Sequence, residues 1–380
     1  MQICHWKKWM FFGKKQNNCS NMKVQNPIHH RFQYLLEFKQ TERKWHFPFL
    51  AALCIGSCLF IGYFSGKPNY GALSSLGALT ILYFTSAPIT QRMIHLAVCA
   101  FGIVFSFSVS SFFGFNAYAG ALSLGIISFL AHFISSYYKI PPPGNFFFIM
   151  VAAMASTYRF DPELIPARVG LVAMGAILSC SFAFLYSVFI EKSKVVAVPR
   201  RTFNKRRYTK FVESAIIGFF MALTLIIGHL LHFNNTYWIS IAAVAIIQGR
   251  NFEHVRQRNM HRILGTFIGI GLAWIILLFN PEKIVMIIII TILQFIIELL
   301  IVRNYGFAVI FITPLTILLA ETASETHHHV ETLMQARLID TVIGSLIGLA
   351  AGFFLHHQQI INNLEKNIRF SYFQFKKLKK

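Results

Sequence analysis

The sequence predicts an all-α membrane protein, a polytopic helical bundle of about 12 transmembrane helices arranged as two parallel six-helix repeats. Three observations carry this prediction. Of the 380 residues, 55% are hydrophobic and only 13% are charged, whereas a soluble domain usually has about 25% charged residues. The apolar residues gather in stretches close to the roughly 20 residues that a spanning helix needs. Cationic and aromatic landmarks recur at a spacing of about 170 residues.

The first half contains about six apolar stretches that we expect to be spans. They lie near residues 47–66, 71–86, 93–113, 117–137, 145–158 and 167–190. About six more follow in the second half, near residues 212–232, 237–249, 263–279, 283–302, 305–320 and 338–356. The stretches 145–158 and 237–249 are short, so tilted, re-entrant and broken helices all remain open for them.

The charges are few but unbalanced, because 35 Lys and Arg residues stand against 14 Asp and Glu, a net charge of +21. Such an excess is typical of nucleic-acid binding in a soluble protein and of cytoplasmic loops in a membrane protein. Here most cations alternate with the spans and fall on one predicted face. This argues against a nucleic-acid partner and predicts a multi-pass protein with both termini in the cytoplasm.

The same segments give the expected domain organisation. It consists of a cytoplasmic basic arm, a first membrane repeat, a basic cytoplasmic linker, a second membrane repeat and a cytoplasmic basic tail. Their bounds are residues 1–46, 47–190, 191–210, 211–357 and 358–380.

The two halves share landmarks in the same order. First half before second, the matches are Arg92 with Arg262, Lys139 with Arg303, Arg168 with Arg337, and Tyr70-Gly71 with Tyr237-Trp238. Six spans is an even number, so both repeats enter the membrane in the same direction, related by an axis along the membrane normal. Two such bundles form a central path whose access alternates when one rocks against the other. Chance similarity between apolar segments is the alternative.

Several motifs together resemble a known family. In the second half they are the run from Tyr237-Trp238 to Gln248-Gly249, then Arg262-x-x-Gly265-Thr266-x-x-Gly269, Arg303-Asn304-Tyr305-Gly306 and Arg337-x-x-Asp340-Thr341-x-x-Gly344. In the first half they are Arg43-Lys44-Trp45-His46-Phe47-Pro48 and Tyr70-Gly71-Ala72-Leu73. They are similar to the fusaric acid resistance (FUSC) family of bacterial inner-membrane proteins, over roughly residues 40–356. That family is distantly similar to the aluminium-activated malate transporters of plants. The resemblance implies the bacterial inner (plasma) membrane and efflux of aromatic carboxylic acids and similar small organic anions.

Four arginines are the candidate substrate-binding cations: Arg92, Arg168, Arg262 and Arg337. A guanidinium group is always charged and binds a carboxylate through two parallel hydrogen bonds. At the mouths of a central path, such residues would attract and orient an organic anion. The alternative is a role at the membrane interface or as a marker of topology, which fits Arg168 and Arg337 less well because they lie on the face poor in cations.

Tyr237, Trp238 and Tyr305 are the candidate aromatic contacts with the substrate. Their rings lie at the ends of short spans, where they could stack on an aromatic acid. The alternative is membership of the belt of Tyr and Trp residues at the membrane interface.

Glu298 and Asp340 are the candidates for proton coupling, because a carboxylate within a span is costly and usually marks an ion path or a buried pair. Burial favours the neutral form of a carboxyl group, so it would take up a proton. The alternatives are ion pairs: Asp340 with Arg337, one helical turn earlier, and Glu298 with Arg303 near the interface.

The remaining motifs predict structure or exclude functions. Gly265-x-x-x-Gly269 and Gly344-x-x-x-Gly348-x-x-x-Gly352 would allow close helix packing. The six cysteines form no Cys-x-x-Cys motif, so we expect no disulfide, no metal and no cofactor. We interpret His327-His328-His329 as a solvated loop, with weak divalent binding as the alternative. The sequence shows no phosphate-binding loop and no nucleophile–base pair, which argues against an ATP-driven pump and against an enzyme.

The predicted function is export of small organic anions, aromatic carboxylic acids first among them, with proton coupling as a hypothesis. A passive organic-anion channel is one alternative, and a non-transporting membrane scaffold for envelope assembly is another. The expected partners are the organic anion and the lipid bilayer. A homo-oligomer and a periplasmic adaptor are left open.

Overall fold

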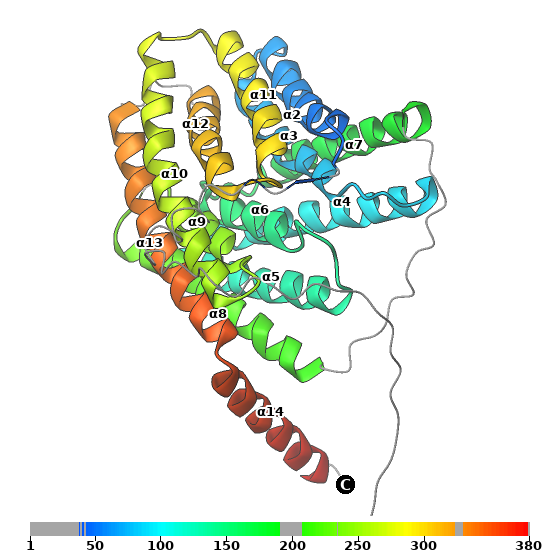
Figure 1. The fold of residues 1–380 in the computed structure, drawn as a ribbon, viewed down its shortest axis with the longest axis vertical. Helices are drawn as coiled ribbons and strands as arrows, with labels where there is room; N and C mark the ends of the chain where they lie inside the picture. Colours follow the sequence, from blue (N-terminus) through cyan, green and yellow to red (C-terminus); the bar gives the residue numbers. More distant parts are fainter. Residues whose placement is uncertain are drawn as a thin grey trace, which may run out of the picture. The chain divides into compact units, whose positions relative to one another are not determined.

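The computed structural model describes residues 38, 40, 41, 43–190, 207–233, 235–323 and 330–378. Every regular element in this part of the chain is a helix (Figure 1). The prediction of an all-α polytopic bundle is therefore confirmed.

The first half forms six α-helices, two of them followed by a short 3-10 helix. They are α2 (His46–Phe64), α3 (Pro68–Ala78) with η1 (Leu79–Tyr83), α4 (Ile89–Phe112) with η2 (Phe113–Phe115), α5 (Ala117–Tyr137), α6 (Phe146–Thr157) and α7 (Ile165–Phe189). Local sequence sets several starts. Pro68 occupies the first turn of α3, Pro88 directly precedes α4, and the Asn116 side chain caps α5.

The second half forms seven helices. They are α8 (Arg207–Leu230), α9 (Tyr237–Ile247), α10 (Phe252–Leu278), α11 (Lys283–Leu300), α12 (Tyr305–Ala323), α13 (Val330–His356) and α14 (Gln358–Leu378). The Asn251 side chain accepts a hydrogen bond from the His254 backbone N–H at 2.8 Å and so caps α10.

Among the described residues, nine helices are long and apolar enough to cross a membrane, fewer than the expected twelve. They are α2, α4, α5, α7, α8, α10, α11, α12 and α13. The other three, α3, α6 and α9, have 11, 12 and 11 residues. At 1.5 Å per residue this is about 17 Å, against a hydrocarbon core of about 30 Å. Short helices near 145–158 and 237–249 were expected. The short length of α3 was not expected, because the 3-10 helix η1 continues the apolar run of α3.

One expectation about a connecting segment needs correction. The segment between the spans expected at 237–249 and 263–279 is mostly helical, because α10 begins at Phe252. The expected basic tail contains α14, which contacts α8 and α13. The arm to residue 37, most of the linker and the His327-His328-His329 segment lie outside the described residues. The domain bounds stay predictions.

The two halves contain the same set of helix contacts. In the first half α3 packs on α2 and α7, α4 on α6 and α7, and α5 on α6. In the second half α9 packs on α8 and α13, α10 on α12 and α13, and α11 on α12. The pairs correspond one to one when α2–α7 are matched in order with α8–α13, which is what a six-helix repeat would produce.

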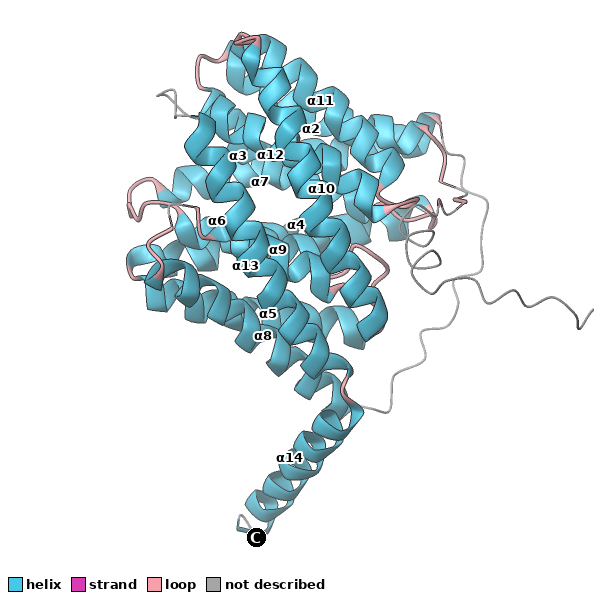
Figure 2. Cartoon of the chain, turned by 60° about the vertical axis from the view of Figure 1, so that its left-hand side comes forward, coloured by secondary structure: helices cyan, strands magenta, loops and turns pink. Residues whose placement is uncertain are grey.

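The contacts between the halves are reciprocal as well. Helix α5 packs along α8, and α11 packs along α2; α6 meets α9, and α12 meets α3. Figure 2 shows α5 beside α8 and α2 beside α11. Each type of interface therefore occurs twice, with the two halves in exchanged positions. An approximate two-fold axis between the halves produces this arrangement. The predicted repeat accounts for this exchange.

Glycines allow the closest helix crossings. A Cβ atom at Gly175 of α7 would overlap the Ser74 carbonyl oxygen of α3, and one at Gly344 of α13 would overlap the Ile239 carbonyl oxygen of α9. A Cβ atom at Gly269 would lie 2.6 Å from the Ile310 carbonyl oxygen of α12. The close packing expected of the two glycine series is thus confirmed. Gly175 and Gly344 act at matching crossings in the two halves.

Gly344→Ala is expected to destabilise the bundle, because the added methyl group overlaps backbone and overpacking typically costs about 1–3 kcal/mol. Thermal unfolding in detergent should show a Tm lower by roughly 2–8 °C. Gly271→Ala in α10 is the matched control, since position 271 has open space around it. An unchanged Tm in Gly344→Ala would contradict the close α9–α13 crossing.

Candidate functional site

Two arginines of the second half are buried among the helices instead of reaching the membrane surface. Arg262 of α10 and Arg337 of α13 are 2% and 1% exposed. These two helices pack on each other, and the two guanidinium charges act on each other. Like charges buried together are costly unless an opposite charge compensates them.

Both guanidinium groups have donors without a hydrogen-bond partner. Nε and Nη2 of Arg262, and Nε and Nη1 of Arg337, are buried without an acceptor. Buried polar groups are almost always hydrogen-bonded in folded proteins, and an unmade bond costs roughly 1–3 kcal/mol, more for a charged group. These four donors are therefore available to an anion or to water.

Asp340 is not hydrogen-bonded to Arg337, although it lies one turn further along α13. Its carboxylate is 1% exposed, and neither oxygen accepts a hydrogen bond. The two groups act on each other only through their charges. The pairing that the spacing allowed is not formed, and a second unsatisfied polar group lies beside the arginines.

Aromatic rings lie against this group of buried charges. The Trp238 ring is 1% exposed, and its centroid is 4.8 Å from the Arg337 guanidinium carbon. The Tyr237 ring is 5.6 Å from that of Trp238, and the Tyr305 hydroxyl is buried without a partner. The structure thus brings Tyr237 and Trp238 together beside Arg337, whereas the Tyr305 ring contacts His261 and Arg258.

A third arginine adjoins the site, which the sequence did not predict. Arg258 lies one turn before Arg262, its guanidinium carbon is 3.9 Å from the Tyr305 ring centroid, and its Nε donates to the Ala245 carbonyl oxygen at 2.8 Å. Arg258, Arg262 and Thr266 follow the i, i+4, i+8 spacing of one helix face. That signal was hidden because the segment was expected to be a loop.

Buried hydroxyl groups complete the site, which we call the cationic cluster. Thr266, Thr341 and Ser345 are fully buried and have no hydrogen-bond partner. We define the cluster by its arginines, its carboxylate, its rings and these hydroxyls: Arg258, Arg262, Arg337, Asp340, Tyr237, Trp238, Tyr305, Thr266, Thr341 and Ser345.

Arg92 has a different environment from its second-half match. It is 1% exposed, but its Nε donates to the Thr85 carbonyl oxygen and its Nη1 to the Ser187 hydroxyl, both at 2.7 Å. Its guanidinium carbon also lies 4.3 Å from the Phe84 ring centroid. These contacts fix the start of α4 against α7. A role in substrate binding stays a prediction for Arg92.

Arg168 is half-buried near the start of α7. Its Nη1 donates to the Arg159 carbonyl oxygen at 2.8 Å, and its guanidinium carbon is 5.6 Å from the Tyr158 ring centroid. Burial raises the pKa of the Tyr158 hydroxyl, and the Arg168 charge opposes that shift. The first half thus holds no counterpart of the buried Arg262–Arg337 pair at these positions.

Glu298 lies outside the cationic cluster and has a partner. Its Oε2 is 3.1 Å from Nη2 of Arg43, and the Gln294 amide donates to its Oε1 at 3.4 Å. Burial lowers the pKa of the Arg43 guanidinium, an effect that Glu298 opposes. The carboxylate therefore contacts Arg43 and not Arg303, the partner that the spacing suggested. The true partner is 255 residues away in sequence, so spacing could not indicate it.

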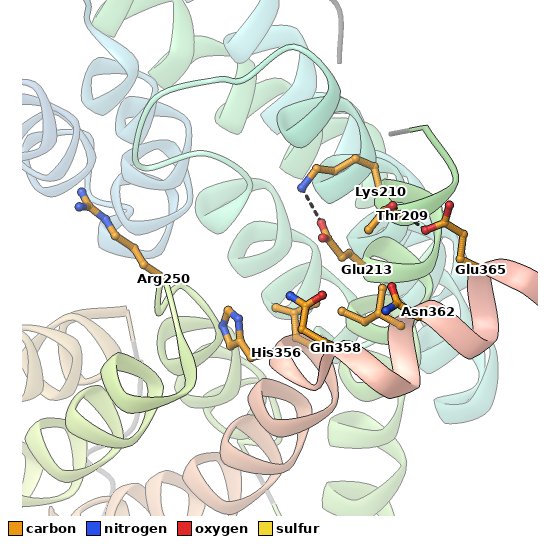
Figure 3. A pocket seen from close by; sticks show the side chains of 10 residues that line it. Thr209, Lys210, Glu213, Arg250, His356, Gln358, Asn362 and Glu365 are labelled. Carbon is orange, nitrogen blue, oxygen red and sulfur yellow. Dashed lines mark hydrogen bonds and ion pairs between the residues drawn. The ribbon is translucent and has the colours of Figure 1, made fainter. Parts of the chain in front are cut away.

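A polar cavity of about 650 Å³ lies where α8, α13 and α14 meet (Figure 3). Three of its charged groups have partners: Nζ of Lys210 is 2.7 Å from Oε2 of Glu213, and the Thr209 hydroxyl donates to Oε2 of Glu365 at 2.8 Å. The Arg250 side chain points away from the Lys210–Glu213 pair. The cationic cluster, whose arginines have unpartnered donors, is therefore the stronger candidate site. Among the described residues, no three His, Cys, Asp or Glu side chains are grouped to hold a metal ion.

The fold and the cationic cluster define a polytopic α-helical membrane protein with a buried, positively charged site in its second half. Residues 222–351 match the family model described as fusaric acid resistance protein-like. This stretch contains the whole cluster, and it confirms the resemblance over the second half of the chain.

Two curated relatives match over a similar length. The uncharacterized membrane protein YvaC of Bacillus subtilis (strain 168) is 34% identical over 137 residues, which are 36% of this chain and 22% of that protein. The uncharacterized protein YhfK of Escherichia coli (strain K12) is 29% identical over 150 residues, 39% of this chain and 20% of that protein. The chain thus aligns with about a fifth of the length of these relatives. No solved structure matches it.

Two equally buried arginines should respond differently to the same substitution. Arg92→Met removes donors from Thr85 and Ser187, at roughly 1–3 kcal/mol each, so we expect a Tm several degrees lower. Arg337→Met removes a buried charge with unmade hydrogen bonds and should leave the Tm unchanged or raise it. Thermal unfolding of both variants in detergent measures this. Equal losses of Tm would contradict the difference between a hydrogen-bonded Arg92 and an Arg337 with unmade hydrogen bonds.

Proposed function

We propose that this protein is a transporter of small organic anions, aromatic carboxylates in particular, and that Arg262 and Arg337 bind the anion. The observation that carries the proposal is the pair of buried guanidinium groups with unpartnered donors. A carboxylate can accept two hydrogen bonds from one guanidinium group, and its charge would relieve the repulsion within the pair.

The surroundings of the arginines favour an aromatic substrate. Aromatic rings attract one another at centroid separations of about 4.5–7 Å in offset or edge-to-face arrangements, and Tyr237, Trp238 and Tyr305 border the arginines. The resemblance to the fusaric acid resistance family, which implies efflux of aromatic carboxylic acids, supports the same substrate class.

The helix arrangement supports transport through the bundle. Short helices that end within the membrane, beside a polar site between two related halves, are a recurring feature of secondary transporters. Here α9 is short and contributes two rings to the cationic cluster. We propose that the two halves are repeats that rock against each other, in the bacterial inner membrane, with both termini in the cytoplasm.

Asp340 is our candidate for proton coupling. Its carboxylate is buried, has no hydrogen-bond partner and lies in the same cluster as the arginines. Its charge would compete with that of an anion, so proton uptake by Asp340 would favour anion binding. Glu298 is less suited to this role, because Arg43 holds it as an ion pair.

The proposal predicts saturable uptake of labelled benzoate into liposomes that hold the purified protein. Arg262→Met and Arg337→Met should each lower uptake about 10- to 100-fold, which corresponds to the loss of one or two charge-assisted hydrogen bonds. Arg256→Met is the matched control, since Arg256 also belongs to α10 but is 52% exposed and only 3.9 Å from Glu253. Uptake is compared with and without an imposed pH gradient.

Two results would count against the proposal. If folded wild-type protein takes up none of several organic anions, the proposed transport function is wrong. If Arg337→Met transports like Arg256→Met, the site is elsewhere. Uptake that is saturable but indifferent to the pH gradient would exclude coupling through Asp340 and favour the passive channel.

A further inference from the structure

An ion pair joins the two halves at the start of α2. Arg43, just before α2 in the first half, contacts the Glu298 carboxylate near the end of α11 in the second half, at 3.1 Å. Its Nη1 also donates to the Glu298 carbonyl oxygen at 3.5 Å, and its guanidinium carbon lies 4.1 Å from the Phe47 ring centroid. Phe38 packs on Phe307 of α12 with ring centroids 5.0 Å apart. The segment before α2 thus rests on the second half.

A second link joins the two short helices α6 and α9. The Gln248 amide, directly after α9, donates to the Asn145 side-chain oxygen, directly before α6, at 2.8 Å. Asn145 is only 5% exposed. This bond therefore connects the halves inside the bundle, where α6 meets α9.

A third link joins α5 and α8. Nδ1 of His132 and the buried Ser214 hydroxyl are 2.9 Å apart, and the Ser136 hydroxyl lies 3.2 Å from Nε2 of the same imidazole. The α5–α8 interface corresponds to the α11–α2 interface under the exchange of halves. A polar contact therefore occupies each of the two matching interfaces.

If successive helices alternate in direction across the membrane, as the sequence predicts, the three links lie at one end of the bundle. When successive helices cross in alternate directions, the starts of α2, α6 and α8 lie at the same membrane face as the ends of α5, α9 and α11. All six side chains that make these links come from those ends. The positive charges predict that this face is cytoplasmic.

The same interfaces look different further along. In α5 and α8 the backbones cross closely at Gly125 and Gly218, where a Cβ atom on Gly218 would lie 2.7 Å from the Gly125 carbonyl oxygen. At the opposite end of these helices, Tyr118 and His229 meet through their rings at 5.9 Å. In the α5–α8 interface the polar contact therefore lies to one side of a tight backbone crossing.

We propose that these three contacts, Arg43–Glu298, Asn145–Gln248 and His132–Ser214, form a polar clasp that closes the cytoplasmic end of the path between the halves. The role of this clasp rests on the proposed transport function. The structure described here corresponds to the closed state of the clasp. Polar groups suit a contact that must open repeatedly, because water replaces their hydrogen bonds when they part. An apolar contact would instead expose hydrophobic surface.

The test measures distance across the cytoplasmic end by electron paramagnetic resonance, in full-length protein in lipid nanodiscs without substrate. Spin labels replace Lys139 and Arg250, which lie in different halves and are exposed. Glu298→Gln and Gln248→Ala should each add a longer distance population above about 10% of the molecules, where a minor state usually holds less. Labels at Glu163 and Asn280, at the opposite end, report whether the bundle as a whole has loosened.

A charge exchange keeps the test decisive. Arg43→Glu combined with Glu298→Arg restores the ion pair with its sign reversed, so the distribution should return toward that of the wild type. If no variant changes the Lys139–Arg250 distances, or if both label pairs broaden equally, the clasp is refuted. Because no substrate is present, absence of benzoate uptake would reject the proposed function and leave this result standing.

Discussion

The burial of two like charges, Arg262 and Arg337, is the constraint on which the rest of this structure depends. Two guanidinium groups that share a dry interior repel each other and lose their water. The surrounding helices do not supply enough acceptors, since four of their donors are unsatisfied. Even the neighbouring Asp340 accepts no hydrogen bond. Such a site is costly as pure architecture, and an anion or a water molecule that accepts from these donors would lower that cost.

The two halves share one helix arrangement but differ in the surroundings of their arginines. Matching contacts and matching glycine crossings persist in both. In the first half, however, Arg92 is hydrogen-bonded to Thr85 and Ser187, so its guanidinium group contributes to the packing of that half. In the second half Nε and Nη2 of the corresponding arginine, Arg262, have no hydrogen-bond partner. Under the proposed function, the first half would support the path and the second half would supply the groups that recognise the anion. The proposed polar clasp lies between them.

Composition and charge alternation were enough to predict the fold class, because a bilayer allows a chain this apolar few alternatives to a helical bundle. They also led to Arg262, Arg337 and the three rings. Arg258 was not predicted as a site residue because the polar first stretch of α10 resembles a loop, although Asn251 is a clear capping residue. The Arg43–Glu298 pair could not be predicted, since it depends on how α2 and α11 meet. The absence of an Arg337–Asp340 pair could not be predicted either, because helix spacing alone favours that pair.

The most direct test of the central claim is equilibrium binding of benzoate to the purified protein, followed through tryptophan fluorescence. Trp238 lies 4.8 Å from the Arg337 guanidinium carbon, so an anion bound there should change its emission. The account predicts a saturable change that disappears in Trp238→Phe, while Arg337→Met weakens binding about 10- to 100-fold. A wild-type protein that shows no saturable change, or an Arg337→Met variant with unchanged affinity, would contradict it.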